Sequence, residues 1–432
     1  MAEALKQIEA PVIRWPGGCF ADDYHYEDGI GPRDERPPRH NLWWEQPESN
    51  AFGTDEYIEF CRMIDTEPYI CANVGSGSPT EAKSWVDYCN FSGDTAHTRM
   101  RAANGHPDPY DVKYWGVGNE NWGCGGGFDP EEYASQFVRF ALYMKRMDTS
   151  IETIACGESM SRWDTWNELF LKKVSRRFDL LDHLALHQYF QQGDGESFSD
   201  DDHYKLMAKV STLEDEIETA AALIWYTTQG KRQIGIIVDE WGLWHPVANT
   251  ANGLEQPATL RDALFAASAL NMFIDHADVL TMTNIAQTIN VLQCLLLTDG
   301  PLMSRTPTYH VFDFFKAHAN GVALKLSLKG PQFAGSDGTS GDYLSASASR
   351  SEDGAITMTV VNRDISETHG ASISVGESGG GMAENVKILT SDDVRDQNTP
   401  NDPDAVTPSD CDSMPLESMT FPPRSITVFT VA

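Results

Sequence analysis

The stretch KYWGVGNEN, residues 113–121, begins like a buried β-strand and ends on an amide beside a carboxylic acid, Asn119 and Glu120. Strands of a parallel sheet are covered on both faces and are therefore apolar along their length. Polar side chains gather where such a strand ends and its loop begins. The stretch therefore predicts a strand of a parallel sheet that presents Glu120 at its carboxyl end.

Seven short apolar runs of this kind recur through the first three quarters of the chain, and each is typical of a buried strand. The intervals between them are long enough for crossover helices. One interval, residues 129–148, repeats Tyr133, Phe137, Phe140 and Met144 on one helical face. Repeated strand and helix units imply a parallel sheet, open or closed. The runs are PVIRW (11–15), PYICANV (68–74), VKYWGVG (112–118), TIACGE (153–158), LALHQY (184–189), GIIVDEW (235–241) and VLTMTNIA (279–286).

The pattern changes from about residue 321, where short segments alternate apolar and polar residues between turns rich in Gly, Asp, Asn and Pro. Such alternation is typical of antiparallel strands with one face on a core and the other in solvent. The clearest segments are DYLSASASR (342–350), AITMTVVNR (355–363) and SITVFTVA (425–432).

The composition suits a folded globular protein, since 41% of the 432 residues are hydrophobic and 10% are aromatic. No segment approaches the roughly 18 consecutive apolar residues of a membrane-spanning helix. The opening MAEALKQIEAPV lacks the basic start and apolar middle of a secretory signal. The eight cysteines are scattered and form no C-x-x-C pair. We therefore expect reduced thiols, a cytoplasmic location and no contact with a membrane.

Acidic residues outnumber basic ones, with 64 Asp and Glu against 32 Lys and Arg and a formal net charge of −32. This charge repels the phosphates of nucleic acid, so nucleic acid is not an expected partner. An acidic surface also repels itself, and salt at about 1 M, where the Debye length is roughly 3 Å, screens that repulsion. The balance favours a halophilic protein, and an ordinary acidic cytoplasmic protein is the alternative.

A second predicted strand also ends on carboxylic acids. GIIVDEWGLWH, residues 235–245, carries an acidic pair that finishes with Glu240. In a parallel barrel the carboxyl ends of all strands lie on one face, so Glu120 and Glu240 would converge there. Two carboxyl groups about 5 to 5.5 Å apart suit a retaining glycosidase, in which one is the nucleophile and the other the acid and then the base.

The neighbours of the two glutamates decide between catalysis and a structural role. Taken singly, a glutamate at a strand end is more often an ion-pair or loop-anchoring residue than a catalyst. Asn119 is able to hydrogen-bond a sugar hydroxyl, and the indoles of Trp241 and Trp244 are able to stack on the apolar face of a sugar ring. Pocket polarity of this kind is typical of ligand sites and favours catalysis.

Six long motifs in the same order resemble glycoside hydrolase family 51, whose members are mainly α-L-arabinofuranosidases. The resemblance runs from about Pro11 to the C-terminus. The motifs are VIRWPGGCFADDYHYEDGIGPRDERP (12–37), EPYICANVGSGSPTEAKSWVDYCN (67–90), VKYWGVGNEN (112–121), LALHQY (184–189), VDEWGLWH (238–245) and HADVLTMTNIAQTINVL (276–292).

The resemblance implies an α/β fold with a (β/α)8-type TIM barrel as the catalytic domain, residues 1–320. A C-terminal antiparallel β-sandwich domain, jelly-roll-like, is expected over residues 321–432. It also implies a retaining, exo-acting enzyme that removes terminal arabinofuranosyl residues from arabinoxylan, arabinan or derived oligosaccharides. Homo-oligomers, commonly hexamers, are a further implication. No cofactor and no metal are expected, and the histidines show no metal-site spacing.

The resemblance assigns a role to individual residues. Glu120 corresponds to the general acid/base and Glu240 to the nucleophile. Substrate contacts are implied for Asn119, His187, Tyr189 and Gln287, while Cys19, Trp43 and Trp44 are placed on loops around the pocket, with Trp241 counted among the substrate-binding residues.

The secondary assignments have structural alternatives. His187 is equally well explained as a core histidine, Tyr189 could pack under the sheet, and Gln287 could cap a helix. The position of Tyr189 and Gln287 after apparent strands favours the pocket for both. Cys19 is not expected to be a thiol nucleophile, because no motif places a histidine partner for it.

The sequence departs from the family at its start. Family members carry a leading segment that contains the first barrel strand and a substrate-contacting acid, whereas the helix predicted from AEALKQIEA, residues 2–10, begins here at once. A barrel of seven strands with its first strand missing is therefore expected. The missing strand leaves a catalytically impaired sugar-binding fragment as one alternative. An endo-β-1,4-glucanase or xylosidase of the same family is another, because specificity lies in loops that the motifs do not describe.

The charge balance generates a prediction about stability. The melting temperature is expected to rise between low salt and about 1 M salt, because screening relieves repulsion among the surface carboxylates. Calorimetry at a series of salt concentrations measures it. A melting temperature that stays constant or falls across the series would favour the ordinary acidic protein.

Overall fold

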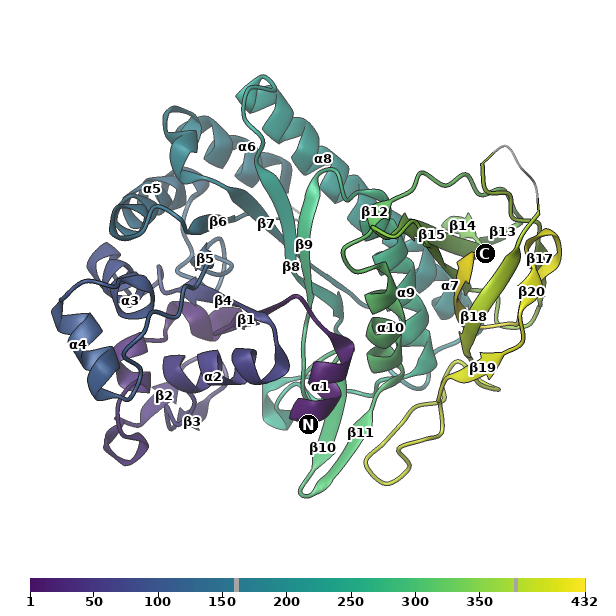
Figure 1. Cartoon of the computed structure of the whole chain (residues 1–432), viewed down its shortest axis with the longest axis horizontal. Coiled ribbons are helices and arrows are strands. Elements are labelled where there is room, and N and C mark those ends of the chain that lie inside the picture. Colours follow the sequence, from purple (N-terminus) through teal and green to yellow (C-terminus); the bar gives the residue numbers. More distant parts are fainter. Residues whose placement is uncertain (159–162, 377–379, 432) are drawn as a thin grey trace.

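Seven parallel strands form the larger part of the fold. The computed structural model describes residues 1–158, 163–376 and 380–431, and Figure 1 shows these strands with helices along their outer side. Their order in the sheet is β1-β4-β5-β6-β7-β8-β9, and each neighbouring pair is parallel. The strands are β1 (Val12–Trp15), β4 (Glu67–Ala72), β5 (Tyr114–Val117), β6 (Glu152–Cys156), β7 (His183–Phe190), β8 (Gly235–Leu243) and β9 (Leu280–Ile285).

The predicted strands and crossover helices are confirmed. Each strand begins within two residues of the apolar run that predicted it. Helix α5 buries Tyr133, Phe137, Phe140 and Met144, the face expected from their spacing. The helices are α1 (Ala2–Ile8), α2 (Thr54–Ile64), α3 (Pro79–Asn90), α4 (Ala96–Ala103), α5 (Pro130–Met147), α6 (Trp163–Val174), α7 (Asp200–Ala208), α8 (Val210–Thr228), α9 (Leu260–Asp275) and α10 (Pro307–Phe315).

The ring of strands is not closed by backbone hydrogen bonds. Within the described ranges no ladder joins β1 to β9, and a cavity of about 950 Å³ is lined by both strands. Helices α1 and α10 cover this side, where Ile8 and Tyr309 belong to a buried cluster that Ile13 of β1 and Ile285 of β9 join. Covering an unpaired strand edge limits its exposure to other chains. The barrel therefore has seven strands, as expected, and one side covered by side chains.

A tyrosine hydroxyl supports edge strand β1. Tyr57 of α2 is buried, and its hydroxyl donates to the carbonyl oxygen of Ile13 in β1 at 2.5 Å. The hydroxyl oxygen of Tyr57 in turn accepts a hydrogen bond from the amide of Tyr69 in β4 at 2.9 Å. One hydroxyl thus links the backbones of two neighbouring strands to the helix that covers them.

The C-terminal region is antiparallel, as predicted. Its main sheet has the order β12-β15-β16-β22-β18-β19, and β20 pairs with β18. The smaller pair β17-β21 packs on this sheet through Met419 and Phe421, which share a buried cluster with Val360 and Phe429. The strands are β12 (Val322–Ala323), β13 (Gln332–Ala334), β14 (Ser340–Asp342), β15 (Leu344–Arg350), β16 (Ile356–Asn362), β17 (His369–Ala371), β18 (Met382–Leu389), β19 (Ser409–Cys411), β20 (Met414–Pro415), β21 (Met419–Phe421) and β22 (Ser425–Val431).

Helix α9 joins the barrel to the C-terminal sheet. It contacts β15, β16 and β22, and Figure 1 shows α9 and α10 between the two regions. Val361 of β16 and Ile426 of β22 belong to the same buried cluster as the barrel core. The central strands are therefore buried on both faces, which differs from the solvated face that their alternating sequence predicts. Covering by helices accounts for the difference.

Short elements complete the chain. Two hairpins are formed by β2 (Arg39–Asn41) with β3 (Gln46–Glu48) and by β10 (Leu296–Asp299) with β11 (Leu302–Arg305). The 3-10 helices are η1 (Gly18–Asp22), η2 (Tyr26–Gly29), η3 (Arg33–Glu35), η4 (Ser175–Leu180), η5 (Thr250–Asn252), η6 (Lys316–His318) and η7 (Leu416–Ser418). Among the helices described here, none has the length and apolar character needed to cross a membrane.

The Tyr57 hydroxyl generates a stability prediction. Tyr57→Phe is expected to lower the free energy of unfolding by about 1–3 kcal/mol, because the amide of Tyr69 and the carbonyl of Ile13 lose a buried partner. Urea denaturation measures the change. Tyr143→Phe is the control, since Tyr143 is 52% exposed and its loss should stay within about 0.5 kcal/mol. Equal effects of the two substitutions would contradict the supporting role of Tyr57.

Candidate active site

Glu120 lies on a tight turn directly after β5. Gly118 and Glu120 both have left-handed backbone, with φ of 88° and 43°, a conformation that is uncommon for a residue with a side chain. The carbonyl oxygen of Glu120 accepts hydrogen bonds from the amides of Gly123 and Gly125 at 2.7 and 3.1 Å. The turn brings the Glu120 carboxylate to His187 of β7, whose Nδ1 lies 3.0 Å from it.

Glu240 lies inside β8 and not at its end, because the strand continues to Leu243. The pairing of β7 with β8 shifts register at this point: Leu186 faces Val238 and His187 faces Glu240, which leaves Asp239 as an extra residue. A bulge of this kind re-aims side chains.

Both acids of the pair consequently reach the same imidazole. Asp239 Oδ1 lies 3.0 Å from His187 Nε2, and Glu240 Oε2 lies 3.6 Å from Nδ1. Regular alternation would have sent the two side chains to opposite faces of the sheet. The bulge therefore builds the acidic side of the site.

Arg14 of β1 connects three of the site residues. Its guanidinium lies 2.8 Å from Glu240 Oε1, donates to Asn119 Oδ1 at 2.6 Å and lies 3.2 Å from Asp239 Oδ2. Burial lowers the pKa of Arg14, but Asp239 and Glu240 outweigh burial and raise it above its ordinary value. Burial also raises the pKa of Asp239, yet the charges of Arg14 and His187 bring it down to about 2.

His187 is a buried cation of the site. Burial lowers its pKa, but Glu240 and Asp239 raise it to about 10. The charged imidazole acts in turn on Glu240: burial raises the pKa of that carboxyl, and His187 and Arg14 lower it below its ordinary value. Glu240 is therefore held ionised, which is the state that a nucleophile requires. His187 is here a contact of the two acids and not a histidine of the hydrophobic core.

Three further predicted residues lie at the site. Tyr189 donates its hydroxyl hydrogen to Glu240 Oε2 at 2.8 Å. Gln287 lines the same cavity as Glu240 and Asp239. Asn119 is buried, and its amide nitrogen has no hydrogen-bond partner among the residues described. These three residues are therefore brought together with the two glutamates.

The tryptophans behave differently from one another. Trp241 is fully buried and packs edge-on against Phe273 with 5.1 Å between ring centroids. It faces away from Glu240 across β8, so the expected stacking of Trp241 on a sugar is not compatible with its position. Trp244 instead packs against Tyr189 at 5.3 Å, and Trp44 belongs to the same partly buried cluster.

The cysteines require a correction. Cys19 of η1 and Cys124 of the Glu120 loop form a disulfide across 105 residues, with a Cα–Cα distance of 5.5 Å. The prediction that all eight cysteines are reduced is wrong for this pair, because the fold brings together two residues whose spacing carries no pairing signal. The other six, Cys61, Cys71, Cys89, Cys156, Cys294 and Cys411, are free thiols.

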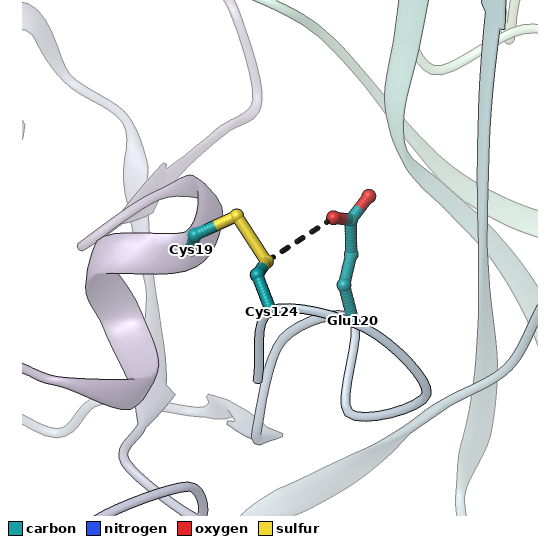
Figure 2. A group of neighbouring side chains, drawn as sticks. All are labelled: Cys19, Glu120 and Cys124. Atoms are coloured by element: carbon teal, nitrogen blue, oxygen red, sulfur yellow. Dashed lines mark hydrogen bonds between the residues drawn. A yellow bond between two sulfur atoms is a disulfide. The ribbon is translucent and has the colours of Figure 1, made fainter. Parts of the chain in front are cut away.

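The disulfide lies beside the carboxylate of Glu120, as Figure 2 shows. Cys124 Sγ is 3.4 Å from Glu120 Oε2. A disulfide sulfur carries no hydrogen and is a weak acceptor, so any hydrogen bond in this contact is donated by the protonated carboxyl of Glu120. The contact suits a group that acts as an acid.

The two glutamates are close enough for one reaction centre. An oxygen of Glu120, an oxygen of Glu240 and a nitrogen of His187 lie within 4.8 Å of one another. This upper limit is compatible with the roughly 5–5.5 Å between the carboxyl groups of retaining glycosidases and lies below the roughly 6.5–9.5 Å of inverting ones. The same three groups could ligate a metal only if His187 lost its proton, and the sulfurs near Glu120 are occupied by their disulfide.

Comparisons with known proteins agree with this geometry. Two family models match: the α-L-arabinofuranosidase 1 domain over residues 4–208 and the α-L-arabinofuranosidase C-terminal domain over residues 239–425. An intracellular exo-α-L-arabinofuranosidase of Bacteroides ovatus is 37% identical over 416 residues, which cover 94% of this chain and 80% of the relative. The chain belongs to the α-L-arabinofuranosidases of glycoside hydrolase family 51.

Solved structures of family 51 share the whole architecture. The arabinofuranosidase of Xanthomonas axonopodis pv. citri superposes with a TM-score of 0.92 at 34% identity, over 100% of this chain and 89% of that one. An α-L-arabinofuranosidase of Thermotoga maritima, solved with arabinose, gives 0.88 at 34% identity over the same shares. The predicted barrel with a C-terminal sandwich is confirmed. The C-terminal family model begins inside β8, so it includes the glutamate of the D-E-W motif.

Sequence reasoning missed Arg14, Asp22 and Cys124. Arg14 had a usable signal, since it is a lone charge inside the apolar run PVIRW. Asp22 and Cys124 had none, because each acts through partners that only the fold brings near.

The raised pKa of His187 generates a prediction about pH. Its folded pKa of about 10 lies above the ordinary histidine value of 6.5, so its contribution to stability is complete below about pH 6.5 and is lost as the pH rises through about 10. The stability difference between the parent and His187→Gln should therefore be largest near pH 6 and shrink towards pH 10. Urea denaturation across this range measures it, with the exposed His40→Gln as control. A difference that does not change with pH would contradict the assignment.

Proposed function

We propose that this family 51 chain is a retaining, exo-acting α-L-arabinofuranosidase. Its substrates would be terminal arabinofuranosyl residues of arabinoxylan, arabinan and the oligosaccharides derived from them. The observation that carries the proposal is the pair of carboxylates, Glu120 and Glu240, within 4.8 Å of each other and in different surroundings. The names of the relatives support arabinofuranose as the sugar that the enzyme removes.

The first step forms a covalent intermediate. Glu240 is ionised and oriented by Arg14 on one oxygen and by Tyr189 on the other. It attacks the anomeric carbon while Glu120 gives its proton to the leaving oxygen. The bond to the leaving group breaks as the bond to Glu240 forms, and the charge that Glu240 loses weakens its ion pair with Arg14.

The second step releases arabinose. Glu120, now ionised, faces His187 at 3.0 Å and takes a proton from the attacking water. Water displaces Glu240 from the anomeric carbon, so two inversions give net retention. Glu120 regains the proton that it gave away, and no cofactor enters either step.

The buried charges are consistent with these roles. Arg14 and His187 supply two positive charges, and Asp239 and Glu240 supply two negative charges. These four charges sum to zero, so the net charge of the site is zero when Glu120 carries its proton. A general acid needs that proton before the first step. Buried ions are tolerated when they are paired in this way.

The proposed substrate contacts are a subset of the predicted ones. Asn119 accepts from Arg14 through its side-chain oxygen, and its amide nitrogen, which has no partner in the described part of the chain, is proposed to donate to a sugar hydroxyl. Gln287 is proposed as a further contact because it lines the cavity at Glu240. Tyr189 and His187 are proposed to act chiefly by orienting the acids. Trp241 is left out.

The disulfide of Cys19 bears both on the pocket and on the compartment in which the protein is found. We place Cys19 at the rim of the pocket, where its disulfide with Cys124 would lie against the substrate. The cytoplasmic location remains a proposal, supported by the word "intracellular" in the name of the Bacteroides ovatus relative. The disulfide argues the other way, since such bonds are rare in a reducing cytosol.

Three further predictions are still to be tested. The division into a catalytic domain of residues 1–320 and a sandwich of residues 321–432 is proposed from the change from parallel to antiparallel strands. Assembly into a homo-oligomer, as a hexamer, rests on the family resemblance alone. Adaptation to high salt rests on the net charge of −32.

The assignment of the two glutamates generates a test with azide. 4-Nitrophenyl α-L-arabinofuranoside should be hydrolysed by the parent, and Glu240→Ala should abolish turnover. Azide should restore it in Glu240→Ala with β-arabinosyl azide as product, because azide replaces the nucleophile. In Glu120→Ala azide should accelerate only the second step and give the α-azide.

The exposed Glu352→Ala serves as control and should retain parental activity. Proton NMR of the azide products distinguishes the two anomers. An α-azide from Glu240→Ala, or no turnover by folded parent, would overturn the proposal.

A further inference from the structure

Asp22 has an unusual set of partners. It is the last residue of η1 and is 4% exposed. One carboxylate oxygen accepts from the amides of Val74 and Gly75 at 2.6 and 2.7 Å. The other accepts from the amide of Asn119 at 2.6 Å and from the side-chain nitrogen of Asn121 at 3.2 Å. Every donor is an uncharged N–H group, and two of them flank Glu120.

The surroundings leave little room around this carboxylate. A Cβ added to Gly75 would lie 2.9 Å from the Asp22 side chain, and one added to Gly125 would lie 2.5 Å from its Oδ2. Contacts of that length are not tolerated, so glycine is needed at both positions. The carboxylate is therefore packed directly against the loops after β4 and β5.

The turn that Asp22 holds is the one that carries the proposed acid/base. Glu120 has φ of 43°. Residues other than glycine rarely adopt this left-handed conformation without support from the surrounding structure. Asp22 fixes the amide before Glu120 and the side chain after it. The Cys19–Cys124 disulfide attaches the same η1 turn to the far end of this loop. Figure 2 shows this second attachment beside the Glu120 carboxylate.

We infer that Asp22 is a positioning residue for Glu120. Its carboxylate holds the backbone of residues 118–121 so that the Glu120 carboxyl meets the leaving-group oxygen, and the Cys19–Cys124 disulfide fixes the loop from its other end. The inference rests on the proposed acid/base role of Glu120. Asp22 itself lies behind the loop and acts only through it.

The test uses leaving groups that differ in their need for a proton. Asp22→Asn replaces one acceptor oxygen with an amide that faces N–H donors, so the loop should shift. With 2,4-dinitrophenyl α-L-arabinofuranoside, whose leaving group departs without an acid, kcat/KM should stay close to the parental value. With an arabinose disaccharide kcat/KM should fall on the order of 10 to 100-fold, because misplacement of about 1 Å costs roughly that much.

Asp23→Asn is the matched control, since it makes the same chemical change one residue along and Asp23 has none of these bonds. It should leave both substrates unaffected. An Asp22→Asn variant that folds and loses kcat/KM equally on both substrates, or on neither, would overturn the inference, because a merely structural role predicts no dependence on the leaving group.

A second variant covers the case in which Asp22→Asn does not fold. The double substitution Cys19→Ala/Cys124→Ala removes the other attachment and should also give a larger loss on the disaccharide than on the dinitrophenyl substrate. A uniform loss in that variant would count against the inference. Glu120→Ala is run beside both: if it too shows no dependence on the leaving group, the proposed role of Glu120 fails, whereas a graded loss in Glu120→Ala alone rejects only the role of Asp22.

Discussion

The site depends on the ion pairs and the hydrogen bond that the Arg14 guanidinium makes. This guanidinium is a buried cation on edge strand β1, and it reaches Glu240 and Asp239 of β8 and Asn119 beyond β5. Removing a charge from water is costly unless oppositely charged groups compensate it, and removal of one partner leaves the others uncompensated. The ionised state of Glu240, the orientation of Asn119 and the position of β1 are therefore coupled through one side chain.

The two glutamates occupy different kinds of structure, and their chemistry follows from this. Glu240 lies within a strand paired on both sides, where two cations lower the pKa of its carboxyl. Glu120 lies on a turn beside a disulfide sulfur and a single cation, His187. Carboxylates in unlike surroundings take unlike roles, and the lowered pKa of Glu240 supports the proposal that it is the nucleophile.

Much of this arrangement could be predicted from the sequence, and the failures have physical causes. The strands, Glu120 and Glu240 follow from apolar runs that end in acids, because the period of a strand and the polarity of its end are local properties. Trp241 was misplaced because ordinary strand alternation puts it on the face of β8 opposite to Glu240, where it packs against Phe273. The meeting of Asp239 and Glu240 at His187 was not predicted, because no local pattern marks the bulge that produces it. The burial of the central C-terminal strands was missed because helix α9, far away in the chain, covers them.

The groups that support Glu120, the proposed acid/base, come from a distant part of the chain. Glu240, the proposed nucleophile, belongs to a strand with a neighbour on either side, so the sheet holds its backbone while Arg14 and Tyr189 orient its carboxylate. An acid on a turn with a left-handed residue has no ladder, and its geometry must be imposed by groups from elsewhere. Here those groups come from one 3-10 turn, residues 18–22, through a carboxylate and a disulfide. Functional loops of this kind place their support where sequence periodicity gives no sign of it, which is why Asp22 and Cys124 emerge only when the chain is folded.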